Sequence, residues 1–319
     1  MKWLRRCAFI LLAAPVAALA QTWPSKPIRL IVPYPPGGGV DYLARLMSKD
    51  LSDRLGTPLI VDNVGGANGS IGAQALARAP ADGYTVMLTS DGPIVASPAL
   101  TPNLPYSPLR DFVAVAMLAS YTGVIVARPS FPARNVDELL SLARRKPDRV
   151  TFASAGIGNF SHLAMELMQS RSGTKMLHVP YRGTAPAIQG LLAGDVDVMF
   201  TSLSTVMDQV KAGKLAALGV GDPQRAAVLP ETQSISESLP GYSYRGWAGL
   251  FAPANTPPTV VSRITREAHE FMRSPQTVRL YEQQQMASSS MTQIEFTAFI
   301  RHEQGTWVNL VKERGIKAE

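Results

Sequence analysis

The chain has 319 residues, with 31 Lys and Arg against 24 Asp and Glu, and a single Cys. Its basic residues are scattered and form no stripe interleaved with aromatic residues, which argues against a nucleic-acid partner. One cysteine excludes an intramolecular disulfide, and about 300 residues exceed the usual size of one hydrophobic core, so we expect two lobes.

The first 20 residues are typical of an export signal. Three basic residues come first: Lys2, Arg5 and Arg6. The apolar run 8–14 follows, and Ala18-Leu19-Ala20 provides the small residues of a cleavage site. A membrane anchor is the weaker alternative, because a spanning helix needs ~20 apolar residues. We expect cleavage after Ala20 and a periplasmic mature protein that starts at Gln21, without Cys7 and without a lipid-anchoring cysteine.

Short apolar runs alternate with helical patterns along most of the chain, which is typical of βαβ units and a parallel sheet. The first unit has a strand pattern at 28–32, a turn at 33–39 and a helix that opens at Asp41. An apolar residue recurs every four positions in this helix: Leu43, Met47, Leu51 and Leu55. Gly56 supplies a C-terminal stop.

The alternation continues to residue 220. Further strands are predicted at 59–61, 84–88, 124–127, 150–153, 176–179, 196–200 and 215–220. The clearest helices are predicted at 70–79, 136–145, 161–170, 185–193 and 203–212. From Pro257 onward the pattern changes to two long helices, 259–272 and 292–314, which we expect to pack back on the first lobe.

Helices that return to the first lobe require the backbone to cross between the lobes twice. The predicted crossings are 113–126 and 244–252. They contain glycines that can absorb a hinge rotation: Gly123, Gly246 and Gly249. The expected fold is α/β with two lobes, each a mainly parallel sheet flanked by helices. The predicted boundaries are 21–123 plus 248–319 for the first lobe and 124–247 for the second.

The segment Pro33-Tyr34-Pro35-Pro36-Gly37-Gly38-Gly39 lies between a predicted strand and a helix. Its glycines let backbone N–H groups approach a ligand, and the helix N-terminus favours an anion. Ligands of open α/β sheets bind at such strand ends, although an ordinary tight connection is the alternative. The continuation Val40-Asp41 matches neither a P-loop nor a dinucleotide fingerprint, and Asp41 is expected to cap the helix.

A second loop, 154–162, also follows a strand and opens a helix, now in the second lobe. Asn159 and Ser161 can donate hydrogen bonds, while Phe160 either packs on a ligand or fills the core. Polar residues recur at other predicted strand ends. The predicted ligand-binding set is therefore Tyr34, Pro35, Gly38, Gly39, Ser70, Ser90, Asp91, Ala155, Gly156, Asn159, Phe160, Ser161, Tyr181, Thr201 and Ser202.

The sequence argues against catalysis. The four histidines, His162, His178, His269 and His302, have no metal-ligand spacing. No Gly-x-Ser-x-Gly elbow is present, so an exported hydrolase that uses Ser161 with a distant histidine is the weakest alternative. We expect no metal and no cofactor.

Several motifs in order resemble the substrate-binding proteins of the tripartite tricarboxylate transporter family, also called the Bordetella uptake gene family. They are Trp23-Pro24-Ser25-Lys26-Pro27-Ile28-Arg29, Val32-Pro33-Tyr34-Pro35-Pro36-Gly37-Gly38, Asp82-Gly83-Tyr84-Thr85, Leu104-Pro105-Tyr106, Asp111-Phe112, His178-Val179-Pro180-Tyr181, Leu239-Pro240-Gly241-Tyr242 and Gly315-Ile316-Lys317. The resemblance covers essentially the whole mature chain. It implies a Venus-flytrap, periplasmic-binding-protein fold whose loops at 34–39 and 154–161 hold a small carboxylate. It also implies a monomer that serves two membrane transporter subunits or, alternatively, a membrane sensor kinase.

The chain departs from this family in three places. Relatives commonly have Ser-Gly-Asn-Gly-Thr-Ser-Ser where residues 155–161 are bulkier and less hydroxylic. Thr201 and Ser202 replace a common Asp-Asn pair, which removes a partner for a ligand ammonium group and favours a plain or aromatic carboxylate over an amino acid. The residues alone do not explain Val64-Gly65 in place of Arg-Pro.

Overall fold

The computed structural model of the protein describes residues 23–317, so the predicted export signal lies outside the described part. The strands are β1 (Ile28–Val32), β2 (Leu59–Asn63), β3 (Thr85–Thr89), β4 (Phe112–Ala127), β5 (Thr151–Ser154), β6 (Leu177–Pro180), β7 (Val198–Ser202), β8 (Ala216–Val220), β9 (Arg245–Pro253) and β10 (Met286–Ser288). Within residues 23–317 no helix is both long enough and apolar enough to cross a membrane.

The helices fall between these strands and after the last of them. They are α1 (Gly39–Leu55), α2 (Ser70–Ala77), α3 (Ser97–Leu100), α4 (Pro108–Asp111), α5 (Val136–Arg145), α6 (Phe160–Ser172), α7 (Thr184–Ala193), α8 (Leu203–Lys211), α9 (Ile235–Ser238), α10 (Pro258–Arg273), α11 (Pro275–Gln283) and α12 (Gln293–Arg314). A short 3-10 turn, η1 (Ala67–Gly69), precedes α2, and a π-helical turn, η2 (Gly92–Ala96), follows β3.

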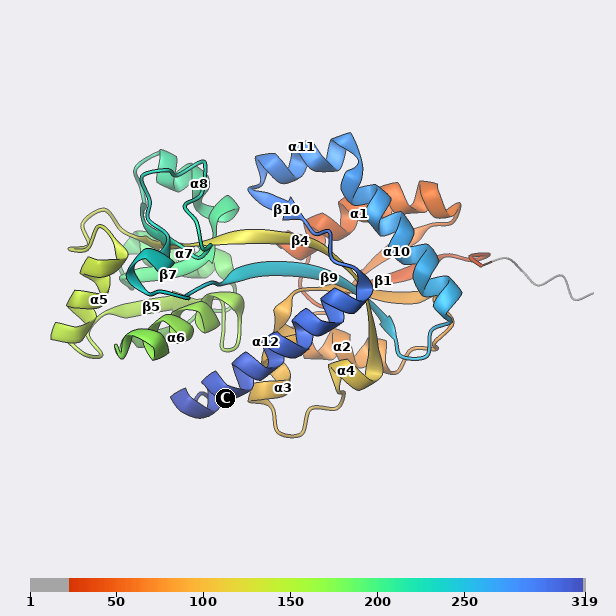
Figure 1. Cartoon of the computed structure of the whole chain (residues 1–319), viewed down its shortest axis with the longest axis horizontal. Helices are drawn as coiled ribbons and strands as arrows, with labels where there is room; N and C mark the ends of the chain where they lie inside the picture. The colour runs from red at the N-terminus through yellow and green to blue at the C-terminus, as the bar shows by residue number, and fades with distance from the viewer. Residues whose placement is uncertain (1–22, 318–319) are drawn as a thin grey trace, which may run out of the picture.

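Two groups of parallel strands form the two lobes, which lie at opposite ends of the molecule in Figure 1. In the first lobe β1 pairs in parallel with β2 and β3. In the second lobe β5 pairs in parallel with β6 and β7. The strands β4 and β9 run between them as an antiparallel pair. The predicted α/β fold with two lobes is confirmed, although the crossing strands make each sheet mixed.

The long strand β4 changes partners near its middle. Tyr121 pairs with Gly246 of β9, whereas Gly123, two residues later, pairs with Ser202 of β7. A Cβ on Gly123 would lie 2.1 Å from the ring of Phe200, so a glycine is needed where the strand enters the second lobe. The sheet is therefore continuous from one lobe to the other.

Helix α12 returns across the first lobe, as the sequence predicts, and also reaches the second. It contacts α3 and η2 in the first lobe, α6 in the second and the crossing strand β4, and in Figure 1 it runs obliquely from the first lobe toward the second. A capping box of Thr292 and Glu295 fixes its start, and Gly315 ends it in the left-handed conformation. The buried side chain of Trp307 anchors its middle against Tyr244.

Helix α11 and strand β10, between the two long helices, were not predicted from the sequence. Ser274 caps α11 by accepting a hydrogen bond from the N–H of Thr277, and Pro275 occupies the first helical position, where proline is favoured. The three residues of β10 then pair with residues 119–121 of β4. So short a strand carries no readable alternation and exists because β4 offers it an edge.

Candidate functional site

The first strand-end loop runs from β1 to α1, and its residues Pro35 to Gly39 are exposed. Tyr34 is turned back toward the sheet, where its Oη lies 2.7 Å from Ser90 Oγ and 3.3 Å from Thr89 Oγ1. Burial raises the pKa of Tyr34 to about 12, so the phenol stays protonated. The side chain fixes the base of the loop and leaves the glycine backbone open to the solvent.

Helix α1 starts at Gly39, two residues before the predicted start, with Gly38 as an N-cap that has no capping side chain. Asp41 reaches back into the loop, and its Oδ2 accepts hydrogen bonds from Gly37 N and Arg45 Nε, each at 2.9 Å. Asn63 Nδ2 donates to the other oxygen at 2.9 Å. Burial alone would raise the pKa of Asp41, but these hydrogen bonds and the Arg45 charge lower it. Asp41 therefore holds the loop. It is not the N-cap residue of α1, so the prediction that it caps the helix is wrong.

The Asp41→Asn variant is expected to be about 1 kcal/mol less stable than the wild type, because an amide cannot accept all of these hydrogen bonds. Urea unfolding checks this. Asp50→Asn is the matched control, since Asp50 also pairs with an arginine four residues later on α1 but touches no loop. Equal losses in the two variants would contradict a role of Asp41 in holding the loop.

The second loop, between β5 and α6, uses most of its amide groups internally. Ser161 Oγ accepts from Ala155 N at 2.9 Å, and Ser154 Oγ accepts from Gly156 N at 3.2 Å. Asn159 caps α6 by accepting from Ser161 N. The two loops are therefore not equivalent: only the first presents a helix start without a capping side chain.

An aromatic cluster connects the residues that follow β3 with the second loop. Asp91, 2% exposed, accepts a hydrogen bond from Tyr244 Oη at 2.8 Å. The Tyr244 ring stacks on Phe160 at 5.1 Å, and Tyr121 packs edge-on against Phe160 at 5.3 Å. Phe160 is itself 7% exposed, so it belongs to the wall between the lobes more than to an open surface.

Other predicted site residues point elsewhere. Ser70 donates a hydrogen bond to Ser97 Oγ inside the first lobe. The Tyr181 ring lies over α7, where its hydroxyl would be 2.2 Å from a Cβ on Gly190. Thr201 is buried, and Ser202 lies 3.0 Å from Ser204 across the first turn of α8. These residues do not join the cluster around Asp91 and Phe160.

Three residues in this region were not predicted from the sequence: Asn68, Tyr121 and Tyr244. Tyr121 lies on the predicted crossing strand, beside Gly246, whose missing side chain makes room for the ring. Burial first, and then the nearby Asp91 and Tyr34 side chains, keep the pKa of Tyr121 well above 10. This pairing depends on the register of β4 and β9, so the sequence alone carried no signal for it.

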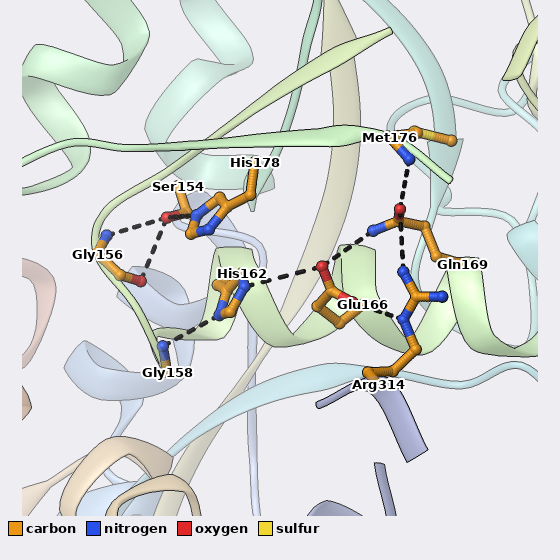
Figure 2. A network of polar contacts seen from close by, with 9 residues as sticks. All are labelled: Ser154, Gly156, Gly158, His162, Glu166, Gln169, Met176, His178 and Arg314. Carbon is orange, nitrogen blue, oxygen red and sulfur yellow. Dashed lines mark hydrogen bonds and ion pairs between the residues drawn. The ribbon is translucent and has the colours of Figure 1, made fainter. Parts of the chain in front are cut away.

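Behind the second loop a chain of polar contacts runs toward the end of α12 (Figure 2). His178 Nε2 lies 2.6 Å from Ser154 Oγ, and its ring stacks on His162 at 4.0 Å. Arg314 Nε donates to Glu166 Oε2 at 2.8 Å, and Glu166 Oε1 lies 3.8 Å from His162 Nε2. Burial lowers the pKa of His162 to about 3 and that of His178 to about 4.

These histidines support the loop: His178 contacts Ser154, and His162 contacts Gly158. Ser161 Oγ donates to Asn159 Oδ1 at 2.9 Å, and His162 Nδ1 accepts from Gly158 N. Within residues 23–317 no group of three His, Cys, Asp or Glu side chains is arranged to hold a metal. Two surface hollows, of about 320 and 210 Å³, lie at α10 and beside α4, away from both loops.

The signature of the tripartite tricarboxylate transporter family receptors matches residues 43–316. The chain belongs to this receptor family. It is 37% identical over 300 residues to a protein encoded between tcbD and tcbE in a Pseudomonas species, covering 93% of this chain and 89% of that protein. BugT of Bordetella pertussis is 34% identical and covers 96% of the receptor, which in turn covers 94% of BugT.

Solved structures have the same fold as this receptor. A Rhodopseudomonas palustris protein solved with adipate superposes with a TM-score of 0.84 at 28% identity, over 92% of the receptor and 99% of that chain. MatC from the same organism, solved with bound malate, gives a TM-score of 0.81 at 28% identity over 91% and 100%. The fold and family expected from the sequence motifs are thus confirmed.

Proposed function

We propose that the protein is a periplasmic receptor that captures a small organic carboxylate between its lobes. The start of α1 carries this proposal: it follows an exposed glycine loop, has no capping side chain and leaves backbone N–H groups without an intrahelical acceptor. Such a helix start attracts an anion through its N–H groups and its dipole. The adipate and malate of two relatives support a carboxylate as that anion.

The second loop has a different task in this mechanism. Because its amides are used internally, its contribution is the wall formed by Phe160, which packs against Tyr121 and Tyr244. A carboxylate held by the first loop would gain contacts to this wall when the lobes close, and those contacts would shift the population toward the closed form. An aromatic wall without a basic side chain favours a ligand with one bound carboxylate and a less polar body.

The closed form would be recognised by the membrane subunits of a tripartite uptake system. The family name supports this partner over a sensor kinase. We place the lobes at 21–123 plus 248–319 and at 124–247, with the hinge where β4 changes partners. The receptor is proposed to act as a monomer after cleavage behind Ala20.

Replacing Gly39 by proline should weaken carboxylate binding at least about tenfold, because it removes one N–H donor to a charged acceptor. Proline fits the first helical position, and Gly38 before it is already extended, at φ −81° and ψ 168°. Isothermal titration with adipate, malate, citrate and benzoate measures the effect. Gly39→Ala is the matched control: a Cβ there meets no atom within 4 Å, and the N–H remains.

Two results would count against the proposed function. Folded wild-type protein that gives no heat with any of the four acids would remove the carboxylate assignment. Binding that Gly39→Pro and Gly39→Ala weaken equally would keep a carboxylate receptor but move the anion away from the start of α1.

A further inference from the structure

One hydrogen bond joins the two lobes directly between their strand-end segments. Asn68 lies in the turn η1 after β2, and Gly158 lies in the loop after β5. Asn68 Nδ2 donates to Gly158 O at 3.1 Å. Asn68 has a left-handed backbone, φ 51°, which asparagine tolerates better than most residues, and its side-chain amide reaches the loop of the second lobe.

The tip of the second loop, at Gly158, fits closely against the first lobe. A Cβ on Gly158 would lie 2.5 Å from Leu100 Cδ1, so a side chain there would have to displace the end of Leu100 on α3. The φ of Gly158 is +72°, which also favours glycine. On the first lobe, a Cβ on Gly92 would lie 2.9 Å from Asn68 Oδ1, so a second glycine is needed to accommodate the asparagine.

The tip is held from behind by its own lobe. Gly158 N donates to His162 Nδ1 at 3.1 Å (Figure 2), and its carbonyl accepts from Asn68, so both backbone polar groups of Gly158 have partners. Because burial keeps His162 neutral, its Nδ1 remains an acceptor. Glu166 lies on the other side of the ring and is fixed by Arg314 at the end of α12.

We infer that the contact between Asn68 and Gly158 is a closing latch between the lobes. It would form only when the tip reaches the first lobe, and it would slow ligand release without touching the ligand. Asn68 is thus a positioning residue for binding. The role of the latch in closure rests on the proposed function. The contact itself does not depend on which ligand is bound.

The test compares closure in Asn68→Asp and wild-type protein by double electron–electron resonance. Spin labels are attached to cysteines that replace the exposed Lys49 on α1 and Arg144 on α5 in the expected mature protein, which starts at Gln21 and has no other cysteine. The aspartate replaces the donating amide by a carboxylate, whose negative charge would face the carbonyl oxygen of Gly158. Without ligand, the ratio of closed to open protein should fall at least about fivefold, because one hydrogen bond contributes about 1 kcal/mol.

Asn255→Asp is the matched control, because Asn255 is also left-handed, at φ 66°, but follows β9 at the far end of the first lobe. It should leave the distance distribution unchanged. Gly158→Ala should also deplete the closed form, through the overlap with Leu100. In 10 mM adipate, the Asn68→Asp variant should release the acid faster and bind it at an unchanged rate.

Three results would overturn the latch: identical distributions for Asn68→Asp and wild type, an equal change in Asn255→Asp, or wild-type protein without a closed distance in either sample. Failure of the proposed function looks different. In that case adipate changes nothing, while the ligand-free closed population still depends on Asn68.

Discussion

Between pH 4.5 and pH 8 the stability of Asp91→Asn and Glu303→Gln is expected to rise relative to the wild type, by about 2 and about 3 kcal/mol. Burial raises the pKa of Asp91 from 3.8 to about 6, and that of Glu303 from 4.5 to about 7. A carboxyl with a raised pKa stabilises the fold below its unfolded pKa and loses that contribution as pH rises through the folded value. An amide does not ionise. Urea unfolding at four pH values measures the difference.

The comparison with wild type is essential because the buried histidines act in the opposite direction. Burial lowers the pKa of His162 to about 3 and of His178 to about 4, so the unfolded chain takes up protons below pH 6.5 and the folded protein does not. Their contribution is lost as pH falls, while that of the carboxyls is gained. The pH dependence of wild-type stability therefore reflects a balance of the carboxyls and the histidines. A stability difference between variant and wild type that stays constant with pH would contradict burial as the cause of the raised carboxyl pKa values.

The Gly72→Ala variant is expected to lose about 2 kcal/mol of stability, whereas Gly305→Ala is expected to gain up to about 1 kcal/mol. A Cβ on Gly72 would lie 2.8 Å from the carbonyl oxygen of Val64 and 2.9 Å from the Cα of Pro33, both backbone atoms that cannot move alone. Gly305, on α12, has no atom within 4 Å of such a Cβ, so alanine only improves helix propensity.

Thermal or urea unfolding of both variants decides this, since the same substitution is made inside a helix each time. Pro33 begins the first loop, so Gly72→Ala should also weaken carboxylate binding, and Gly305→Ala should not. A stable Gly72→Ala protein with unchanged binding would show that α2 can shift without disturbing the loop.

Local patterns predicted the elements that local interactions determine. The four-residue apolar spacing of α1 and its stop at Gly56 are both present, with Gly56 left-handed at φ 70°. The glycine loop after β1 was found because a strand, a turn and a helix follow each other within a few residues. The crossing segments were found because long apolar stretches with glycine stand out from the shorter strands.

The contacts that assemble the site could not be predicted in this way. Asp91 and Tyr244 are 153 positions apart, and Asn68 and Gly158 are 90 apart. Such pairs depend on how β4 and β9 bring the lobes together, and no local period encodes this. For the same reason the sequence does not distinguish Glu303 from the other polar residues of a long helix, although burial, and then the nearby Asp91, raise the pKa of its carboxyl.

The continuity of β4 limits how the lobes can move. Its residues 112–122 are bonded to β9 and its residues 123–127 to β7 and β8, so no free peptide separates the two sheets. Opening of the lobes would therefore twist the two adjacent strands β4 and β9, and their resistance increases with the angle of twist. The open and closed forms of the receptor would therefore differ in the twist of these two strands, and the contacts made on closure would hold that twist.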